Sequence, residues 1–462
     1  MKSLTATIVF IQLSILSILQ FAHINVLIPN IRIVIMDLGV SYSFMGVFMG
    51  IYIFLSGVAA LAWSLYSDLK GVKRKALMAG GITASGILSF LSVHVSNPYI
   101  FAFLYVMAGM SISVINVLAL TIIIDFYQSE ERTEKLMVFK IMGGVGYALG
   151  FALGIFLGAR YNNWKYPIFI LSILILCIGL PLSLSIIEPP KGLSEKELTN
   201  VLSRVGYYPF TLRPSDIKII TGNKSNIYIT LQGMFGIIAA GSLEVWIVQY
   251  LVKETGANEV TASIFLGISV IGALGGILIS HIADDLYKKS RKAKPLLAGV
   301  CSVLVAIFFI VFLLLPLKIE VQTTSFVGAL KVIGEQIVES YIMALAFILF
   351  FIGMIFSSSI GSIRNSVISD VNLPEHRATV ISGINIAELF SKSIGVALVG
   401  ILIDVMGSIR YPLILAIATW FISGYFWFMV ARYVEHDIWK VTILLEERVS
   451  FLEQPYMKRV SL

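Results

Sequence analysis

Two charged residues, Glu388 and Lys392, stand four positions apart inside one apolar stretch of the chain. A charge at the centre of a bilayer costs roughly 2.5–3.5 kcal/mol on insertion scales, so such residues usually serve a function. Residues four apart share one face of a helix, which predicts that these two side chains can pair. Glu388 lies 11 residues beyond Arg377, about 16 Å along a helix and close to a bilayer midplane. With Asn385 beside it, the pair indicates a site for an ionic solute or a proton; a structural salt bridge is the alternative.

Other polar groups inside apolar stretches could line the path of a solute. These candidates are Gln20, His23, Asn25, Asn116, Gln232, Glu244 and Arg364. His23 could also carry a proton, because imidazole titrates near neutral pH. The structural alternative is that each group only joins helices by hydrogen bonds, and that Arg364 snorkels from a helix end to the surface.

A third set of charges lies in short loops and at the helix ends beside them. A carboxylate at a helix end can bond the N-terminal amides of a neighbouring helix and latch one conformation. We therefore expect gating roles here, with solvated loop charges that only set topology as the alternative. The residues of this set are Asp68, Gly71, Arg74, Asp125, Arg132, Asp284, Asp285, Asp370 and Arg377.

The elements that must position these residues are membrane-spanning helices. The 462 residues are 58% hydrophobic and only 13% charged, and the apolar residues fall in runs long enough to cross about 30 Å of hydrocarbon. Backbone groups in lipid must pair within their own segment, so each run predicts a helix and the fold class is all-α. We predict twelve spans near 7–30, 42–66, 76–95, 99–124, 137–158, 165–187, 227–251, 259–283, 295–316, 341–363, 379–404 and 411–433.

The distribution of basic residues orients these spans. Of the 34 Lys and Arg residues, 24 fall on the side that holds both termini and seven on the other side. This bias predicts a cell-membrane protein with both termini in the cytoplasm. It also accounts for the net charge of +7 without nucleic acid as a partner.

The chain repeats itself. Residues 125–167 match residues 370–412 at one constant offset, so that Asp125 corresponds to Asp370 and Arg132 to Arg377. Two copies of six spans have the same orientation and predict two parallel halves. We expect an N-terminal half at 1–187, a cytoplasmic linker at 188–226, a C-terminal half at 227–433 and a cytoplasmic tail at 434–462. The twin of Glu388 is Gly143, so the ionic pair belongs to one half only.

Glycines recur every fourth residue along the fifth span, at 146, 150, 154 and 158. Small residues at this spacing allow two helices to approach closely. The stripe predicts tight packing, to which a sliding role during a movement of the two halves could be added.

The loop after the second span resembles the Gly-x-Leu-x-Asp-Arg-x-Gly-Arg-Arg pattern of the major facilitator superfamily. It keeps Asp68, Gly71 and the basic run, with Ser64 in place of the first Gly and Leu69 in place of the first Arg. An acidic residue after the fourth span and an Arg opening the fifth are also similar to that family. The resemblance implies the major facilitator fold, with substrate held between the halves and a path lined by the first and seventh helices.

Residues 188–192, Glu-Pro-Pro-Lys-Gly, resemble a phrase of the spinster-like branch, which is associated with lipid-like and other organic solutes. The family's drug–proton antiporters carry a Gly-Pro in helix 5 and an Arg in helix 4. This chain has Phe151 and Tyr105 there instead, which argues against drug–proton antiport.

These observations together predict a secondary active or facilitative transporter of a small organic solute that works by alternating access, with proton coupling as an option. Lysolipid-like amphiphiles, organic anions, sugars and drugs all remain open as substrates. We expect a monomer in the bilayer without a cofactor: there is no phosphate-binding Gly-rich loop, and the five histidines lack metal-ligand spacing. An intramembrane enzyme, a channel and a non-transporting membrane sensor are the alternatives.

Overall fold

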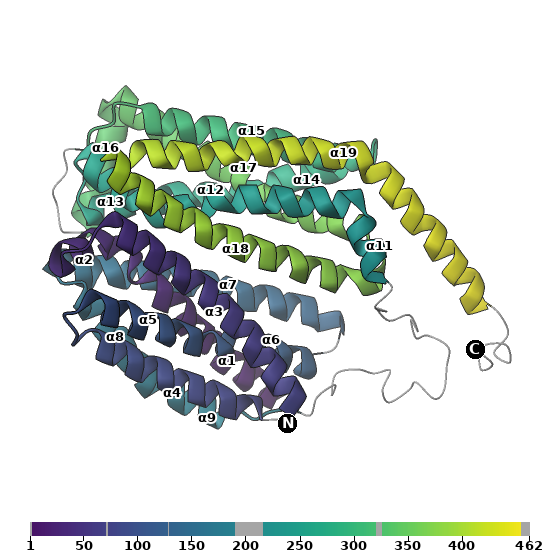
Figure 1. Cartoon of the computed structure of the whole chain (residues 1–462), viewed down its shortest axis with the longest axis horizontal. Coiled ribbons are helices and arrows are strands. Elements are labelled where there is room, and N and C mark those ends of the chain that lie inside the picture. The colour runs from purple at the N-terminus through teal and green to yellow at the C-terminus, as the bar shows by residue number, and fades with distance from the viewer. Residues whose placement is uncertain (1, 71–72, 128, 190–215, 320–325, 454–462) are drawn as a thin grey trace.

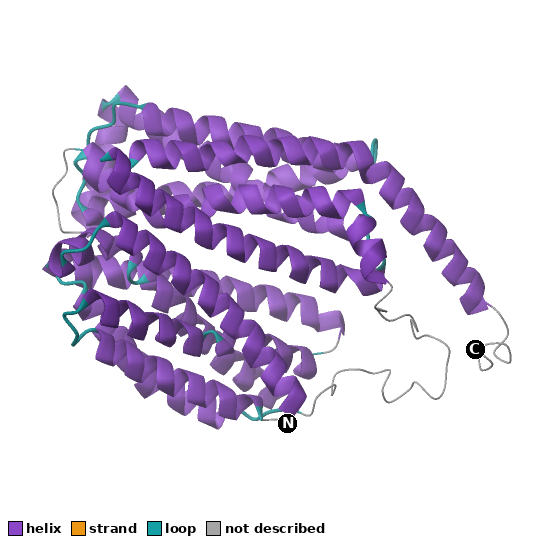
Figure 2. Cartoon of the chain, viewed as in Figure 1, coloured by secondary structure: helices purple, strands orange, loops and turns teal. Residues whose placement is uncertain are grey.

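A computed structural model describes the chain except for residues 1, 71–72, 128, 190–215, 320–325 and 454–462. In the described part every regular element is helical (Figure 2). Twelve helical segments are long and apolar enough to cross a membrane, which confirms the predicted number of spans and the all-α class. The protein is therefore a multi-pass membrane protein.

The N half comprises the first six spans. Its helices are α1 (Lys2–Asn25), η1 (Ile28–Asn30), α2 (Ile31–Leu38), α3 (Tyr42–Lys70), α4 (Arg74–Ser92), α5 (Pro98–Ile112), α6 (Val114–Phe126), α7 (Ser129–Leu153), η2 (Gly154–Ala159), α8 (Lys165–Leu174), η3 (Ile175–Gly179) and α9 (Leu180–Ser185). α1 continues through η1 into α2, so the first span runs over Leu4–Leu38 and is longer than the sequence predicted.

The C half comprises the last six spans and two shorter helices, α11 and α16. Its helices are α11 (Asp216–Gly222), α12 (Lys224–Thr255), α13 (Glu259–Val270), η4 (Ile271–Gly275), α14 (Gly276–Tyr287), α15 (Ala293–Leu314), α16 (Phe326–Glu339), α17 (Tyr341–Asp370), α18 (Pro374–Met406) and α19 (Arg410–Glu453). The helix of the twelfth span does not end near residue 433: α19 continues unbroken to Glu453, through part of the predicted tail.

The two halves lie side by side, with α1–α9 forming one bundle and α12–α19 the other (Figure 1). α1 begins and α19 ends at the same end of the molecule, which we call the terminal end. The ribbons of α3 and α18 lie close together at the opposite end and diverge toward the terminal end (Figure 1). The conformation is therefore one in which the halves meet at the end opposite the termini.

Local sequence explains where the spans begin and end. Asn97, Asn223 and Asn258 each accept a backbone hydrogen bond at the first turn of the helix that follows, which satisfies amides that have no partner within the helix. Gly39 and Gly256 end the first and seventh spans with φ of 61° and 82°, a left-handed conformation that favours glycine. The two glycines occupy equivalent places in the two halves, in agreement with the internal repeat.

The glycine stripe of the fifth span packs against α1. A Cβ added at Gly146 would meet the backbone of Ile18, and one added at Gly150 would meet the backbone of Ala22. The predicted close packing is thus confirmed, and α1 is the partner. Glycines also allow the halves to touch: a Cβ at Gly46 of α3 would lie 2.8 Å from the Cα of Gly400 in α18.

Candidate functional site

A cavity of about 820 Å³ lies between the two halves. α7 and η2 line it from the N half, while α12, α13 and α17 line it from the C half. Most of its wall is apolar, as shown by Phe151, Ile155, Leu243, Ile264, Phe350 and Trp420. Polar groups are few: Glu244 is the one acidic or basic side chain among the lining residues, with Tyr147, Ser263 and Ser357 as hydroxyls. Such a cavity suits a largely apolar molecule that carries a charged group.

Glu244 forms an ion pair with Lys392. The Lys392 Nζ lies 2.7 Å from a carboxylate oxygen of Glu244, and the two side chains are 22% and 30% exposed. The pair joins α12 to α18. Gly241 makes this approach possible, because a Cβ there would collide with the methylenes of Lys392. A solvent-accessible pair of this kind, at the edge of an apolar cavity, can exchange its partners for those of a solute.

A second ion pair joins Glu388 of α18 to Arg364 of α17. Both side chains are mostly buried, at 14% and 19% exposed. Glu388 also lies against α12, where a Cβ at Gly233 would meet its carboxylate. The guanidinium of Arg364 is thus used for pairing, whereas the sequence left open that it only reaches for the surface.

The predicted pairing of Glu388 with Lys392 is wrong. Although they share a face of α18, each charge has its partner on a different helix, Arg364 on α17 and Glu244 on α12. The physical reason is that successive helical positions four apart differ by about 40° in direction, enough here for one side chain to face each neighbouring helix. Four charges therefore form two neutral pairs across three helices.

His23 lies in the core of the N half rather than in the cavity. Its side chain is fully buried, Nδ1 lies 2.7 Å from the Tyr52 hydroxyl, and Nε2 lies 2.8 Å from the Ser89 hydroxyl. The ring also stacks on Tyr105 at a centroid separation of 4.6 Å. His23 thus joins α1 to α3, α4 and α5, which matches the hydrogen-bonding alternative in this conformation.

The remaining polar candidates are dispersed. Asn25 donates to the carbonyl of Phe21 in its own helix, and buried Gln232 donates to Ser423 of α19 at 3.2 Å. Gln20 and Asn116 are half-buried in the N half, and Asn385 is exposed on α18. None of these five residues lines the cavity.

At the terminal end of the N half, Arg74 organises a buried charge cluster. Its guanidinium donates to Asp125 at 2.6 Å and to Glu188 at 2.9 Å, and also to the carbonyl of Pro189. The backbone N–H of Arg74 donates to Glu188 as well. Burial raises the pKa of Glu188, but the hydrogen bonds from Arg74 outweigh this and hold the pKa below its usual value of 4.5. The cluster ties the start of α4 to the end of α6 and to the segment that follows α9.

The corresponding charges of the C half form looser contacts. Lys294 at the start of α15 pairs with Asp284 at 2.8 Å and donates to Ser366. Asp285 pairs with Lys288 three residues later, and both are exposed. Arg377 donates to the carbonyl of Asn372, and Asp370 ends α17. Gly71 and the side chains of Asp68 and Arg132 lie outside the described residues.

The contacts that hold the halves together at the opposite end were missed by sequence reasoning. The carboxylate of Asp404, near the end of α18, accepts backbone hydrogen bonds from Tyr42 at 3.2 Å and Ser43 at 2.6 Å. These are the first amides of α3, so a charge of one half caps a helix of the other. Arg32 of the N half also lies 3.6 Å from Glu259 of the C half. The only signal in the sequence was an acidic residue three positions before Gly407, which ends the eleventh span.

Comparison with known proteins places this arrangement in a family. A model of the Major Facilitator Superfamily matches residues 13–387. Protein spinster homolog 1 of Xenopus laevis is 25% identical over 419 residues, which cover 85% of this chain and 73% of that protein. The sphingosine-1-phosphate transporter SPNS2 of Danio rerio is 24% identical over 271 residues, covering 55% of this chain and 51% of that protein.

Solved structures give the same fold. A bacterial homolog of the human lysosomal transporter spinster, in an inward-facing and unoccupied conformation, matches with a TM-score of 0.73 at 15% identity, over 94% of this chain and 98% of that one. A D-xylose–proton symporter matches with a TM-score of 0.64 at 12% identity, over 93% of this chain and 97% of that one. At these identities the likeness is one of fold alone.

Proposed function

The chain belongs to the Major Facilitator Superfamily and is a membrane transporter, and on that premise we propose that it carries an amphiphile with an ionic head group. The observation that carries this proposal is the central cavity, which is apolar over most of its wall and has the Glu244–Lys392 pair at its edge. A hydrocarbon chain gains about 25 cal/mol for each Å² of apolar surface that it removes from water. A sugar would instead need many hydrogen-bonding groups, and the cavity wall offers few.

The relatives favour the same class of substrate. SPNS2 of Danio rerio is named as a sphingosine-1-phosphate transporter, and sphingosine-1-phosphate is an amphiphile with an apolar chain and a charged head. This chain shares 24% identity with it over 55% of its length. The relation supports an amphiphilic substrate without specifying which one.

In the proposed mechanism the head group exchanges partners with the Glu244–Lys392 pair. An anionic oxygen of the head group binds the Lys392 ammonium, and the carboxylate of Glu244 is released. Glu244 can then bind a cationic group of the solute or take up a proton, so that the cavity never holds an unpaired charge in a medium of low dielectric constant. Glu388 and Arg364 remain paired and keep α17 aligned with α18.

We further propose that the terminal end is cytoplasmic, as the bias of basic residues indicates. The Asp404 contact then closes the outer side in the present conformation, and rocking of the halves breaks it. The Arg74 cluster with Asp125, and the Lys294–Asp284 pair of the C half, would brace the cytoplasmic ends of each half during this movement. Asp68, Gly71, Arg132, Asp285, Asp370 and Arg377 stay candidates for gating on the basis of the sequence pattern.

Thermal stabilisation of the purified protein tests the substrate class. Sphingosine-1-phosphate, a lysophosphatidic acid, an organic anion without a chain and D-xylose are added separately. A ligand at 100 times its Kd stabilises the folded state by about 2.7 kcal/mol if it binds only that state. We expect stabilisation by the two amphiphiles, reduced in Glu244→Gln and Lys392→Gln.

Lys288→Gln is the matched control, because it removes the same charge from an exposed position outside the cavity. Stabilisation by D-xylose or the short organic anion, without any response to the amphiphiles, would contradict the proposal. Equal stabilisation of wild type, Lys392→Gln and Lys288→Gln would exclude the ion pair as the head-group site.

A further inference from the structure

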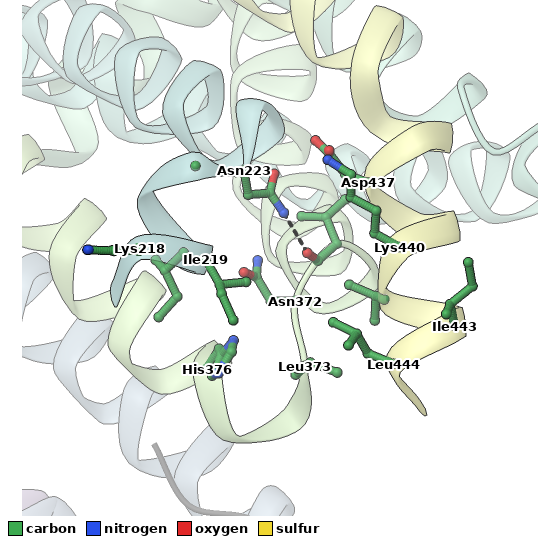
Figure 3. Close-up of a pocket in the computed structure, with 14 residues that line it drawn as sticks. Lys218, Ile219, Asn223, Asn372, Leu373, His376, Asp437, Lys440, Ile443 and Leu444 are labelled. Atoms are coloured by element: carbon green, nitrogen blue, oxygen red, sulfur yellow. Dashed lines mark hydrogen bonds between the residues drawn. The ribbon is translucent and has the colours of Figure 1, made fainter. Parts of the chain in front are cut away.

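A second cavity, of about 460 Å³, opens at the terminal end of the C half. It lies between α11, the turn that joins α17 to α18, and the part of α19 that continues beyond the bundle (Figure 3). It shares no lining residue with the central cavity. It is therefore a separate site, and the proposed transport mechanism does not use it.

The walls of this cavity are mostly apolar, and a lysine stands at each of two edges. Ile219, Leu373 and Leu444 are among the lining residues, while Lys218 stands on the α11 side and Lys440 on the α19 side (Figure 3). Both lysines are exposed. In the part of the chain that the structure describes, neither of them belongs to an ion pair.

The acidic groups nearby are already engaged. Buried Asp437 accepts from the backbone N–H of Ser225 at 2.9 Å and from its hydroxyl at 2.7 Å, and so caps the first turn of α12. His376 lies 3.4 Å from the carboxylate of Asp216. The charge left available to a ligand is thus cationic.

The start of α18 adds to this positive potential. Leu373 precedes the first turn of α18 and contributes no side-chain cap, and both Leu373 and His376 line the cavity. The N-terminus of a helix carries about half a positive charge. An anion in this cavity would therefore meet a helix end as well as the two lysines.

The cavity also lies at the level where the spans leave the apolar layer. α17 ends at Asp370 and α12 begins at Lys224, directly beside lining residues. On α19, Trp439 is 58% exposed and stacks with His436. Exposed tryptophan is typical of the membrane–water interface, where its ring sits among lipid head groups.

From these observations we propose that the cavity binds a phospholipid with an anionic head group. The phosphate lies at the rim of the cavity, in the positive potential of Lys218 and Lys440, and the upper part of an acyl chain contacts Ile443 and Leu444. The lipid would thus contact the start of α18, and α18 carries one partner of each ion pair, Glu388 and Lys392, farther along. This proposal does not depend on the identity of the transported solute.

The test uses the full chain in detergent with dihexanoyl-phosphatidylglycerol as the probe. Dihexanoyl-phosphatidylcholine, with the same chains, and glycerol phosphate, with the same phosphate but no chain, are the comparisons. The Kd is obtained from the melting temperature as a function of ligand concentration. We expect stabilisation by phosphatidylglycerol only.

The variant Lys218→Ala/Lys440→Ala should raise the Kd about 30-fold. A lysine beside an anionic lipid is worth about 1 kcal/mol, and 1.4 kcal/mol corresponds to tenfold. Lys288→Ala/Lys289→Ala is the control, because it removes two exposed charges outside the cavity. Gly222→Phe should also weaken binding, since a Cβ at this lining position meets nothing within 4 Å and the larger ring takes up free volume.

Three results would overturn the proposal. Equal stabilisation by phosphatidylcholine would show that the head-group charge is not recognised. Equal stabilisation by glycerol phosphate would identify a site for a soluble phosphate. An unchanged Kd in Lys218→Ala/Lys440→Ala or in Gly222→Phe would place the lipid elsewhere on the protein.

Discussion

Replacing Asp404 with Asn should shift the protein toward the conformation that is open at the end opposite the termini. In the present conformation the Asp404 carboxylate caps the first turn of α3 across the interface between the halves. Asn keeps the shape of the side chain but loses the charge. A charge at a helix N-terminus contributes about 0.3–1 kcal/mol at an exposed position, and its two hydrogen bonds are stronger than neutral ones. Since Asp404 is exposed, we expect a total of about 1–2 kcal/mol, or roughly a 5–30-fold change in the population ratio.

The population can be measured as the rate at which a cysteine is modified from the opposite end. Ser263→Cys is a near-isosteric probe, because Ser263 lines the cavity from α13 and is only 3% exposed. A membrane-impermeant maleimide is added to the face opposite the termini, in a background where the exposed Cys177 is replaced by Ser. We expect the initial rate to rise by the same 5–30-fold in Asp404→Asn.

Asp37→Asn is the matched control. Asp37 is an exposed carboxylate near the same end, but it contacts Lys165 at 3.7 Å and Trp164 at 3.0 Å within the N half. Its loss should leave the labelling rate unchanged. The reasoning is refuted if Asp404→Asn labels at the wild-type rate, or if Asp37→Asn accelerates labelling as much.

Four further predictions concern stability and the cavity. Arg74→Ala should lower the unfolding free energy by about 1.5–3 kcal/mol, because it removes the charged donor of the hydrogen bonds to Asp125 and Glu188. A melting temperature within 1 °C of wild type would contradict this. The pKa of Glu188 is lowered in the folded state, so its pairing stabilises the protein fully above pH 4.5 and less as the pH falls through the folded-state pKa. In Glu188→Gln the melting temperature should therefore fall less steeply with decreasing pH below 4.5 than in wild type. An unchanged dependence of the melting temperature on pH would count against this. Gly150→Leu should lower the unfolding free energy by about 1–3 kcal/mol or more, because the new side chain overpacks against α1. Gly144→Leu should leave it unchanged, since a Cβ at Gly144 meets nothing within 4 Å. Equal melting temperatures of the two variants would argue against the packing role. Gly267→Trp should weaken the stabilisation by amphiphiles, because the indole occupies part of the cavity that Gly267 lines. The melting temperature without ligand should stay unchanged, since a Cβ at Gly267 meets nothing within 4 Å. Full retention of binding would place the solute outside the cavity.

Much of the fold could be predicted because the bilayer imposes it. A run of about 20 apolar residues must become a helix in lipid, and the twelve predicted spans are all present. The family assignment made from the loop at 64–75 agrees with the match over residues 13–387. The errors lie at the ends of spans, where polarity no longer decides: α19 runs to Glu453 because nothing in its sequence stops the helix at the membrane surface.

The site was predicted less completely because its contacts join distant parts of the chain. The cost of placing a charge in an apolar span pointed to Glu388, Lys392, Glu244 and Arg364. In the structure these four side chains pair with one another, Glu388 with Arg364 and Glu244 with Lys392. It did not find Asp404, whose partners precede it by more than 360 positions. It grouped His23 with the path, although that side chain is enclosed by Tyr52, Ser89 and Tyr105.

The sequence by itself thus determined which segments cross the membrane, that the chain is a duplicated pair of six-helix halves, and which charges are too costly to be incidental. These properties follow from local composition and periodicity, because the lipid acts on each segment alone. Only the tertiary structure decided which charge meets which. Which partners meet depends on how closely two helices approach. Gly233 and Gly241 of α12 leave room for the side chains of Glu388 and Lys392 of α18, although about 150 positions separate them in the sequence.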